Sequence, residues 1–156
     1  TAIPNNLYGE NDNFHLMDSH VIPAIIRKVH EAKMLNKPHF VLWGSGNALR
    51  EFTYSKDLAN ILLFLLNTYD GGAPINIGNN REISIKFLAE MISDIMQYKG
   101  DILWDTSKPE GQYRKPSNNK NLIKLGWDPK SFIDIRKGLK KTCEWYIMNY
   151  PSIRGV

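Results

Sequence analysis

Segments with helical periodicity alternate along this chain with short apolar runs, and this alternation constrains the fold more than any other feature. After Ser84 the apolar residues fall at the spacing of one helical face: Leu88, Met91, Ile92, Ile95 and Met96. Similar stripes predict helices at about 19–34, 55–67 and 133–149. The last is expected to turn Ile135, Leu139, Cys143, Tyr146 and Ile147 inward. Each of Ser19, Ser55 and Ser84 precedes such a segment and is expected to cap it, because a serine hydroxyl accepts a first-turn N–H.

Between these helices, short runs are typical of strands. They lie at 39–43, 50–54, 75–77 and 101–104, and residues 50–54 alternate polar and aromatic side chains as a half-buried strand does. Helices that alternate with strands predict an α/β fold. Residues 1–9 read as the end of a strand that runs into a loop.

Two polar stretches interrupt the pattern. Residues 9–19 are rich in Asn and Asp, and residues 107–119 contain two prolines and a glycine. A loop as long as the second is either functional or disordered. Both stretches are therefore candidate site loops.

Composition indicates a globular protein, because 42% of the 156 residues are hydrophobic and 23% are charged. No apolar run approaches the ~20 residues that span a bilayer, and no secretory signal is recognisable. The single cysteine fits a reducing compartment, so we expect a cytoplasmic protein without a membrane partner. The net charge of +4 suits an anionic ligand, whereas scattered basic residues argue against a nucleic-acid partner.

The residues alone give no catalytic constellation. The four histidines lack zinc spacing, so no metal site is expected, and Gly44-Ser45-Gly46 lies between two expected strands rather than before a helix. The residues alone therefore indicate an α/β domain with polar loops.

Four blocks of the sequence indicate a family as well as a fold class. They are Pro4-Asn5-Asn6-Leu7-Tyr8-Gly9, Ser19-His20-Val21-Ile22-Pro23-Ala24, Trp43-Gly44-Ser45-Gly46 followed by Arg50-Glu51-Phe52, and Ser107-Lys108-Pro109-Glu110-Gly111 followed by Arg114-Lys115. Their order and spacing resemble the C-terminal part of the GDP-L-fucose synthase family, which are extended short-chain dehydrogenase/reductases. The second block, S-H-V-I-P-A, separates this family from most of that superfamily.

The resemblance implies an enzyme that converts GDP-4-keto-6-deoxy-mannose to GDP-L-fucose by epimerisation at C3 and C5 and reduction at C4. NADP(H) would be the cofactor, a GDP-sugar the substrate and a homodimer the assembly. The family's glycine-rich cofactor loop, its Tyr-x-x-x-Lys pair and its catalytic cysteine precede the matching segment. We therefore expect this chain alone to be inactive, and Cys143, on a late helix, to belong to the core.

The resemblance also implies a division of the chain. Residues 1–156 form the nucleotide-sugar-binding part, with 1–9 as the end of a Rossmann strand. The helix and strand within 55–78 are expected to pack on the Rossmann domain. Without that domain their apolar faces would be exposed, which predicts poor solubility or self-association of this chain.

By the same resemblance, His20 is the proton donor of the epimerisation, a role that imidazole suits because its pKa lies near neutrality. The cofactor residues are Pro4, Asn5, Asn6, Leu7 and His20, and the substrate residues are Lys28, Trp43, Arg50, Glu110 and Lys115. Arg50 is the best diphosphate ligand, because a guanidinium donates paired hydrogen bonds to phosphate oxygens.

Four of these assignments have a structural alternative. His20 could simply begin a helix, Arg50 could pair with Glu51 or Asp57, Trp43 could be a core residue, and Lys28 could be a solvated helix-face lysine.

Two other functions stay open: another nucleotide-sugar epimerase or dehydratase, and a non-catalytic nucleotide-sugar-binding module. Departures from the family pattern are Asn5 for Thr, Glu10-Asn11 for Pro-His and Glu110 for Asp.

Overall fold

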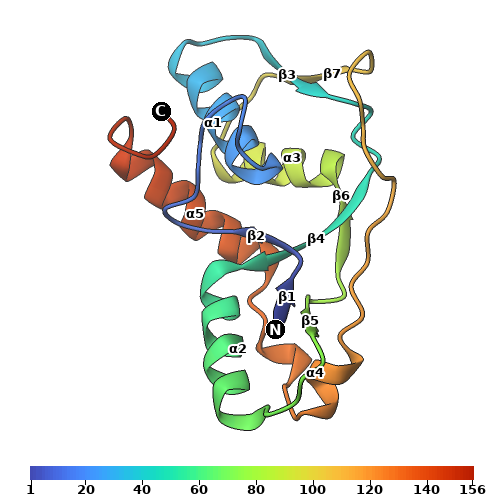
Figure 1. Ribbon diagram of the computed structural model, residues 1–156. Coiled ribbons are helices and arrows are strands. Elements are labelled where there is room, and N and C mark those ends of the chain that lie inside the picture. Colours follow the sequence, from blue (N-terminus) through green and yellow to red (C-terminus); the bar gives the residue numbers. More distant parts are fainter.

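The computed structural model describes residues 1–156 as an α/β arrangement with two apolar cores. Helices α1 (Val21–Met34), α3 (Ile85–Ile95) and α5 (Ile135–Asn149) pack together in the upper part of Figure 1. They enclose the larger core, a cluster of 20 buried residues that includes Ile25, Ile92 and Leu139.

Three small sheets run through the molecule. Strands β3 (His39–Trp43) and β7 (Asp101–Asp105) pair in parallel at the top of Figure 1. In the middle, β4 (Leu49–Tyr54) lies between β2 (Asn6–Tyr8), which is parallel to it, and β6 (Glu82–Ser84), which is antiparallel. Below them, β1 (Ala2–Pro4) pairs in parallel with β5 (Ile75–Ile77).

Strand β4 departs from the expected half-buried pattern. All four residues from Glu51 to Tyr54 are buried, because helices and loops cover both faces of this central strand. The expected alternation failed because it is a property of strands with one solvated face. The consequence is that Glu51 places a carboxylate inside the protein.

The lower part contains α2 (Ser55–Thr68), α4 (Lys120–Lys124) and the 3₁₀ turn Pro129–Ser131. Its core is a cluster of six buried residues that includes Ile61 and Ile77. Of the apolar residues of α2, only Ile61 and Leu65 are buried, whereas Leu62, Leu63 and Leu66 are exposed. In α5, the expected inward placement is wrong for Ile147, which is 48% exposed near the end of the helix.

Only one of the three serines expected to cap a helix does so. Ser84 caps α3 as expected, since its Oγ accepts a hydrogen bond from the Phe87 amide. The other two expectations are wrong: α1 begins after His20 and α2 after Tyr54, and neither has a side-chain cap. Ser19 lies one position before the cap, and Ser55 is already in the helix.

The expected polar loops contain little regular structure. Residues 9–20 form turns, and residues 106–119 contain only an isolated bridge between Leu49 and Arg114. No helix of the structure has the length and apolarity needed to cross a membrane.

Candidate functional site

Three adjoining hollows lie where the β1–β2 junction, the start of α1, the β3–β4 turn and the 106–119 segment meet. Between them they are lined by eight of the ten residues predicted as ligands: Pro4, Asn5, Asn6, Lys28, Trp43, Arg50, Glu110 and Lys115. Trp43 lines two of the hollows and Asn6 lines another two. The hollows are therefore parts of one continuous surface.

The central hollow, of about 210 Å³, brings together Asn6, Trp43, Arg50 and Glu110. Its floor includes Gly46, whose φ of +78° lies in the left-handed region and whose hypothetical Cβ would lie 2.7 Å from the Trp104 ring. A side chain at Gly46 would meet both obstacles, so the turn requires glycine there.

The second hollow, of about 250 Å³, is mainly apolar and contains Lys28 and Trp43. Trp43 is 53% exposed, so it is not the core residue of the alternative interpretation. Lys28 is half-buried rather than solvated: its Nζ donates to the Val41 carbonyl at 2.9 Å, and burial lowers the pKa of its ammonium. Lys28 and Lys108 each place Nζ 5.9 Å from the Trp43 ring centroid, within the range of cation–π attraction.

The third hollow, of about 400 Å³, is polar and lies at the β1–β2 junction. Pro4, Asn5 and Asn6 form one side, and Lys115 with the residues that follow it forms the other. The Oδ1 atom of Asn5 is buried without a hydrogen-bond partner.

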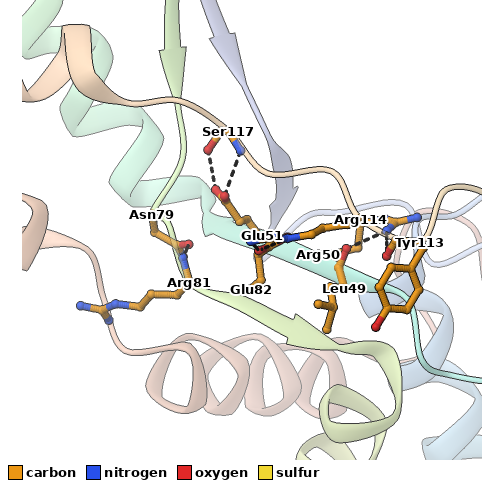
Figure 2. A network of polar contacts seen from close by, with 9 residues as sticks. All are labelled: Leu49, Arg50, Glu51, Asn79, Arg81, Glu82, Tyr113, Arg114 and Ser117. Carbon is orange, nitrogen blue, oxygen red and sulfur yellow. Dashed lines mark hydrogen bonds and ion pairs between the residues drawn. The ribbon is translucent and has the colours of Figure 1, made fainter.

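Arg50 contacts the loop rather than an acid. Its guanidinium donates to the carbonyls of Leu49 at 2.7 Å and Tyr113 at 3.4 Å (Figure 2). It also donates to the carbonyl of Gln112 at 2.6 Å, in the same 106–119 segment as Tyr113. Neither acid of the alternative interpretation pairs with it, since Glu51 binds elsewhere and Asp57 accepts from the Ile133 amide. Arg50 is half-buried beside the central hollow, with its charge uncompensated by a carboxylate.

Glu110 closes the β3–β4 turn. Its carboxylate accepts a hydrogen bond from the Ser45 amide, and this bonding lowers the pKa of Glu110 below its ordinary value. The carboxylate is therefore ionised near neutral pH and faces the same hollow as Arg50.

Two predicted residues line none of the three hollows. Leu7 is in the middle of β2, paired with Thr53 of β4. His20 is the exposed N-cap of α1 with an extended backbone, and its side chain makes no capping bond. Its neighbours Ser19 and Val21 line the second hollow, and Val21 also lines the central one.

Sequence reasoning missed Lys108, Ser45 and the role of Glu51. Lys108 and Ser45 lie inside the quoted blocks, so the blocks themselves were the available signal. Glu51 also lies in a quoted block, and a further signal was its carboxylate within a strand that continues into aromatic residues.

The arrangement suits an anionic ligand with a flat ring. Lys28, Arg50 and Lys115 supply positive charge, Trp43 supplies an exposed aromatic face, and no group of three potential metal ligands is present.

The chain is similar in sequence and in structure to known proteins. Residues 1–78 match the model of the NAD dependent epimerase/dehydratase family. The chain is 46% identical over 149 residues to a putative GDP-L-fucose synthase 2 of Arabidopsis thaliana, covering 96% of this chain and 45% of that protein. It is 45% identical over 149 residues to a GDP-L-fucose synthase of Sinorhizobium fredii, covering 96% and 47%.

A solved structure whose name is close to those of these relatives is also similar to this chain. The crystal structure of a GDP-L-fucose synthetase from Naegleria fowleri bound to NADP superposes with a TM-score of 0.92 at 35% identity, covering 98% of this chain and 48% of that one. The chain thus spans about half the length of the curated relatives it matches.

Proposed function

The chain belongs to the NAD dependent epimerase/dehydratase family, and from this premise we propose that it is the GDP-sugar-binding half of a GDP-L-fucose synthase. In the proposed reaction GDP-4-keto-6-deoxy-mannose is epimerised at C3 and C5 and then reduced at C4. The observation that carries the proposal is the convergence of eight of the ten predicted ligands on one hollowed surface.

In this proposal each side chain has a role that follows from its position. Arg50 donates paired hydrogen bonds to the diphosphate, and Lys28 and Lys115 add positive charge on either side. Trp43 packs against the guanine or the sugar, and the ionised Glu110 accepts a hydrogen bond from a ligand hydroxyl. His20, whose neighbours Ser19 and Val21 line the hollows, gives a proton to the sugar carbon on the face opposite to its removal.

The residues fit one end of NADP. The third hollow is polar, and the buried Oδ1 of Asn5 is an acceptor without a donor, which the amide of a nicotinamide ring would supply. Pro4, Asn5, Asn6 and Leu7 would hold that end, with His20 nearby. When bound, NADPH supplies the hydride for reduction. The expected ligands of the remaining cofactor lie outside this chain, so we propose that the chain alone is inactive.

Calorimetric titration of this chain with GDP, GDP-mannose and UDP tests the proposal. We expect saturable binding of both GDP ligands, no binding of UDP, and at least tenfold weaker binding by the Arg50→Ala variant, because the diphosphate loses its paired donors. Arg81→Ala is the matched control, since Arg81 is exposed and its side chain points away from the site in Figure 2. A folded chain that binds neither GDP nor GDP-mannose would contradict the ligand assignments.

The same titration separates the other functions. Binding of UDP in place of GDP favours another nucleotide-sugar epimerase or dehydratase. A non-catalytic module would bind GDP, yet it would gain no epimerase activity when joined to a cofactor-binding half, whereas the proposed enzyme would lose that activity with His20→Ala.

The proposal extends to the surroundings of the chain. We propose that the parent enzyme is a cytoplasmic homodimer. We also propose that residues 1–9 are the end of a strand of its Rossmann domain. The helix and strand within 55–78 would pack on that domain, which would cover the exposed leucines of α2.

A further inference from the structure

Glu51 is a buried carboxylate without a cation. It is 1% exposed and lies on β4, between β2 and β6. A buried charge is costly unless hydrogen bonds satisfy it. Glu51 meets this requirement without an ion pair: Oε1 accepts from the Ser117 amide at 2.9 Å, and Oε2 accepts from the Ser117 hydroxyl and from Asn5 Nδ2 at 3.0 Å.

These partners join the two sides of the third hollow. Asn5 belongs to the β1–β2 junction, and Ser117 follows Lys115 on the opposite side. The neighbouring Asn6 is also held there, since its Nδ2 donates to the backbone carbonyl of Glu51 at 2.9 Å. Glu51 of β4 therefore contacts both sides of the third hollow and sets the distance between them.

The 112–119 segment has few other attachments to β4 and β6. Before Lys115, Arg50 holds the carbonyls of Gln112 and Tyr113, the Leu49 amide also donates to the Tyr113 carbonyl at 2.8 Å, and Glu82 forms an ion pair with Arg114. After Lys115, Glu51 holds Ser117 (Figure 2). Further along, Asn119 Nδ2 donates to the Gly78 carbonyl and, at 2.9 Å, to Asn80 Oδ1. Lys115 itself is exposed, so its position depends on the anchors on its two sides.

Gly78 packs closely against this anchor. A Cβ added at Gly78 would lie 2.0 Å from Ser117 Oγ and 2.5 Å from Glu51 Oε2, so a side chain at this position would displace the serine and the carboxylate. The glycine allows β5 to end directly against the carboxylate and the serine.

We propose that Glu51 is a positioning residue that fixes the Lys115-bearing segment against the Asn5–Asn6 junction and so shapes the third hollow. The anchoring is a property of this chain alone, and its effect on a ligand rests on the proposed function.

Amide hydrogen exchange measured by NMR tests the anchor without any ligand. Glu51→Leu keeps a similar volume but removes all three side-chain acceptor contacts. We expect the Ser117 amide to exchange at least tenfold faster in this variant, while the amides of α3 change less than twofold. Glu51→Gln should restore most of the protection, because its oxygen still accepts from Ser117 and Asn5 can turn its amide to accept from the new NH₂.

Glu82→Leu is the matched control. It removes a carboxylate from the neighbouring strand at the position paired with Glu51, and it releases Arg114 instead of Ser117. Ser117 exchange should stay within twofold of the original. Unchanged Ser117 exchange in Glu51→Leu, or an equal acceleration of the α3 amides, overturns the anchor.

GDP titration then tests the consequence for the ligand. We expect at least fivefold weaker binding by Glu51→Leu and at most a twofold change in Glu51→Gln. Unchanged GDP affinity despite faster Ser117 exchange overturns the positioning role. If the original chain binds no GDP, the proposed function fails, whereas the exchange result still decides whether Glu51 anchors the segment.

Discussion

Ser84 accepts a hydrogen bond from the Phe87 amide at 3.1 Å across the first turn of α3. Replacing an N-cap serine by alanine costs about 1 kcal/mol, because a first-turn N–H loses its partner. We therefore expect Ser84→Ala to lower the free energy of unfolding in urea by about that amount. Ser55→Ala is the control: Ser55 is inside α2 and makes no capping bond, so equal losses in both variants would contradict the cap assignment.

His30 gives the chain a pH-dependent stability. Its ring packs 4.5 Å from the Tyr150 ring and 5.2 Å from that of Tyr146, and its Nε2 is buried without a partner. Burial lowers the pKa of His30 below 6.5, and Lys33 adds to this effect while Glu31 opposes it. The unfolded chain therefore takes up the proton first on acidification.

It follows that this contribution to stability is complete above about pH 6.5 and is lost as the pH falls toward the lower folded-state pKa. In His30→Phe, the decrease in unfolding free energy between pH 7.5 and 5.5 should be smaller than in the original chain. His39→Gln removes an exposed histidine and should leave the decrease unchanged. Parallel pH profiles for the original chain and His30→Phe would exclude this role.

At the scale of elements, α2 presents an unpaired apolar face. Leu63 is 61% exposed and Leu66 is 81% exposed, whereas Ile61 on the inner face is fully buried. Exposed apolar patches favour association. We expect sedimentation velocity to show concentration-dependent self-association of this chain, and Leu63→Glu with Leu66→Glu to reduce it without loss of helical circular dichroism.

The control for this prediction is Leu103→Glu. Leu103 is an exposed leucine of β7, in the upper part of the molecule, so its replacement should leave self-association unchanged. A monomeric original chain at all concentrations would contradict the prediction.

Local pattern predicted most elements because their apolar periodicity is strong. The strand at Ile75–Ile77 and the helix after Ser84 were recognisable without tertiary information. Strand β6 was not, because Glu82–Ser84 is short and polar and is a strand only through its pairing with β4. The first residues of α1 and α2 were each misplaced by one position. A serine near the start of a helix is a cap only if its backbone is extended and its Oγ reaches the first turn.

The candidate site, too, could be predicted only in part from the sequence. The resemblance named ligands that the fold then brought to one surface, although Pro4 and Lys115 are more than a hundred residues apart along the chain. The contacts of Arg50 with Gln112 and of Glu51 with Ser117 were not predictable, because these partners belong to a segment without periodicity. Hydrogen bonds of this kind depend on where a loop lies, which local sequence does not determine.

The whole molecule has two apolar cores of unequal size. We expect the part around the smaller core to have the lower free energy of local opening. The upper core contains 20 buried residues and the lower core six. Fewer buried apolar contacts give a lower free energy of local opening. We therefore expect α2 and β5 to open before α1, α3 and α5 in native-state hydrogen exchange at low urea concentrations.

A matched pair of substitutions tests this division. Ile61 in the lower core and Ile92 in the upper core are both 0% exposed. Each Ile→Ala change should cost about 2–5 kcal/mol within its own core. Ile61→Ala should accelerate exchange in α2 and β5 while α3 keeps its protection, because the upper core does not depend on the lower one. Ile92→Ala should accelerate exchange in α3 and leave α2 nearly unchanged, since α2 already exchanges through its own openings. If both variants accelerate both regions equally, the two cores unfold as one cooperative unit.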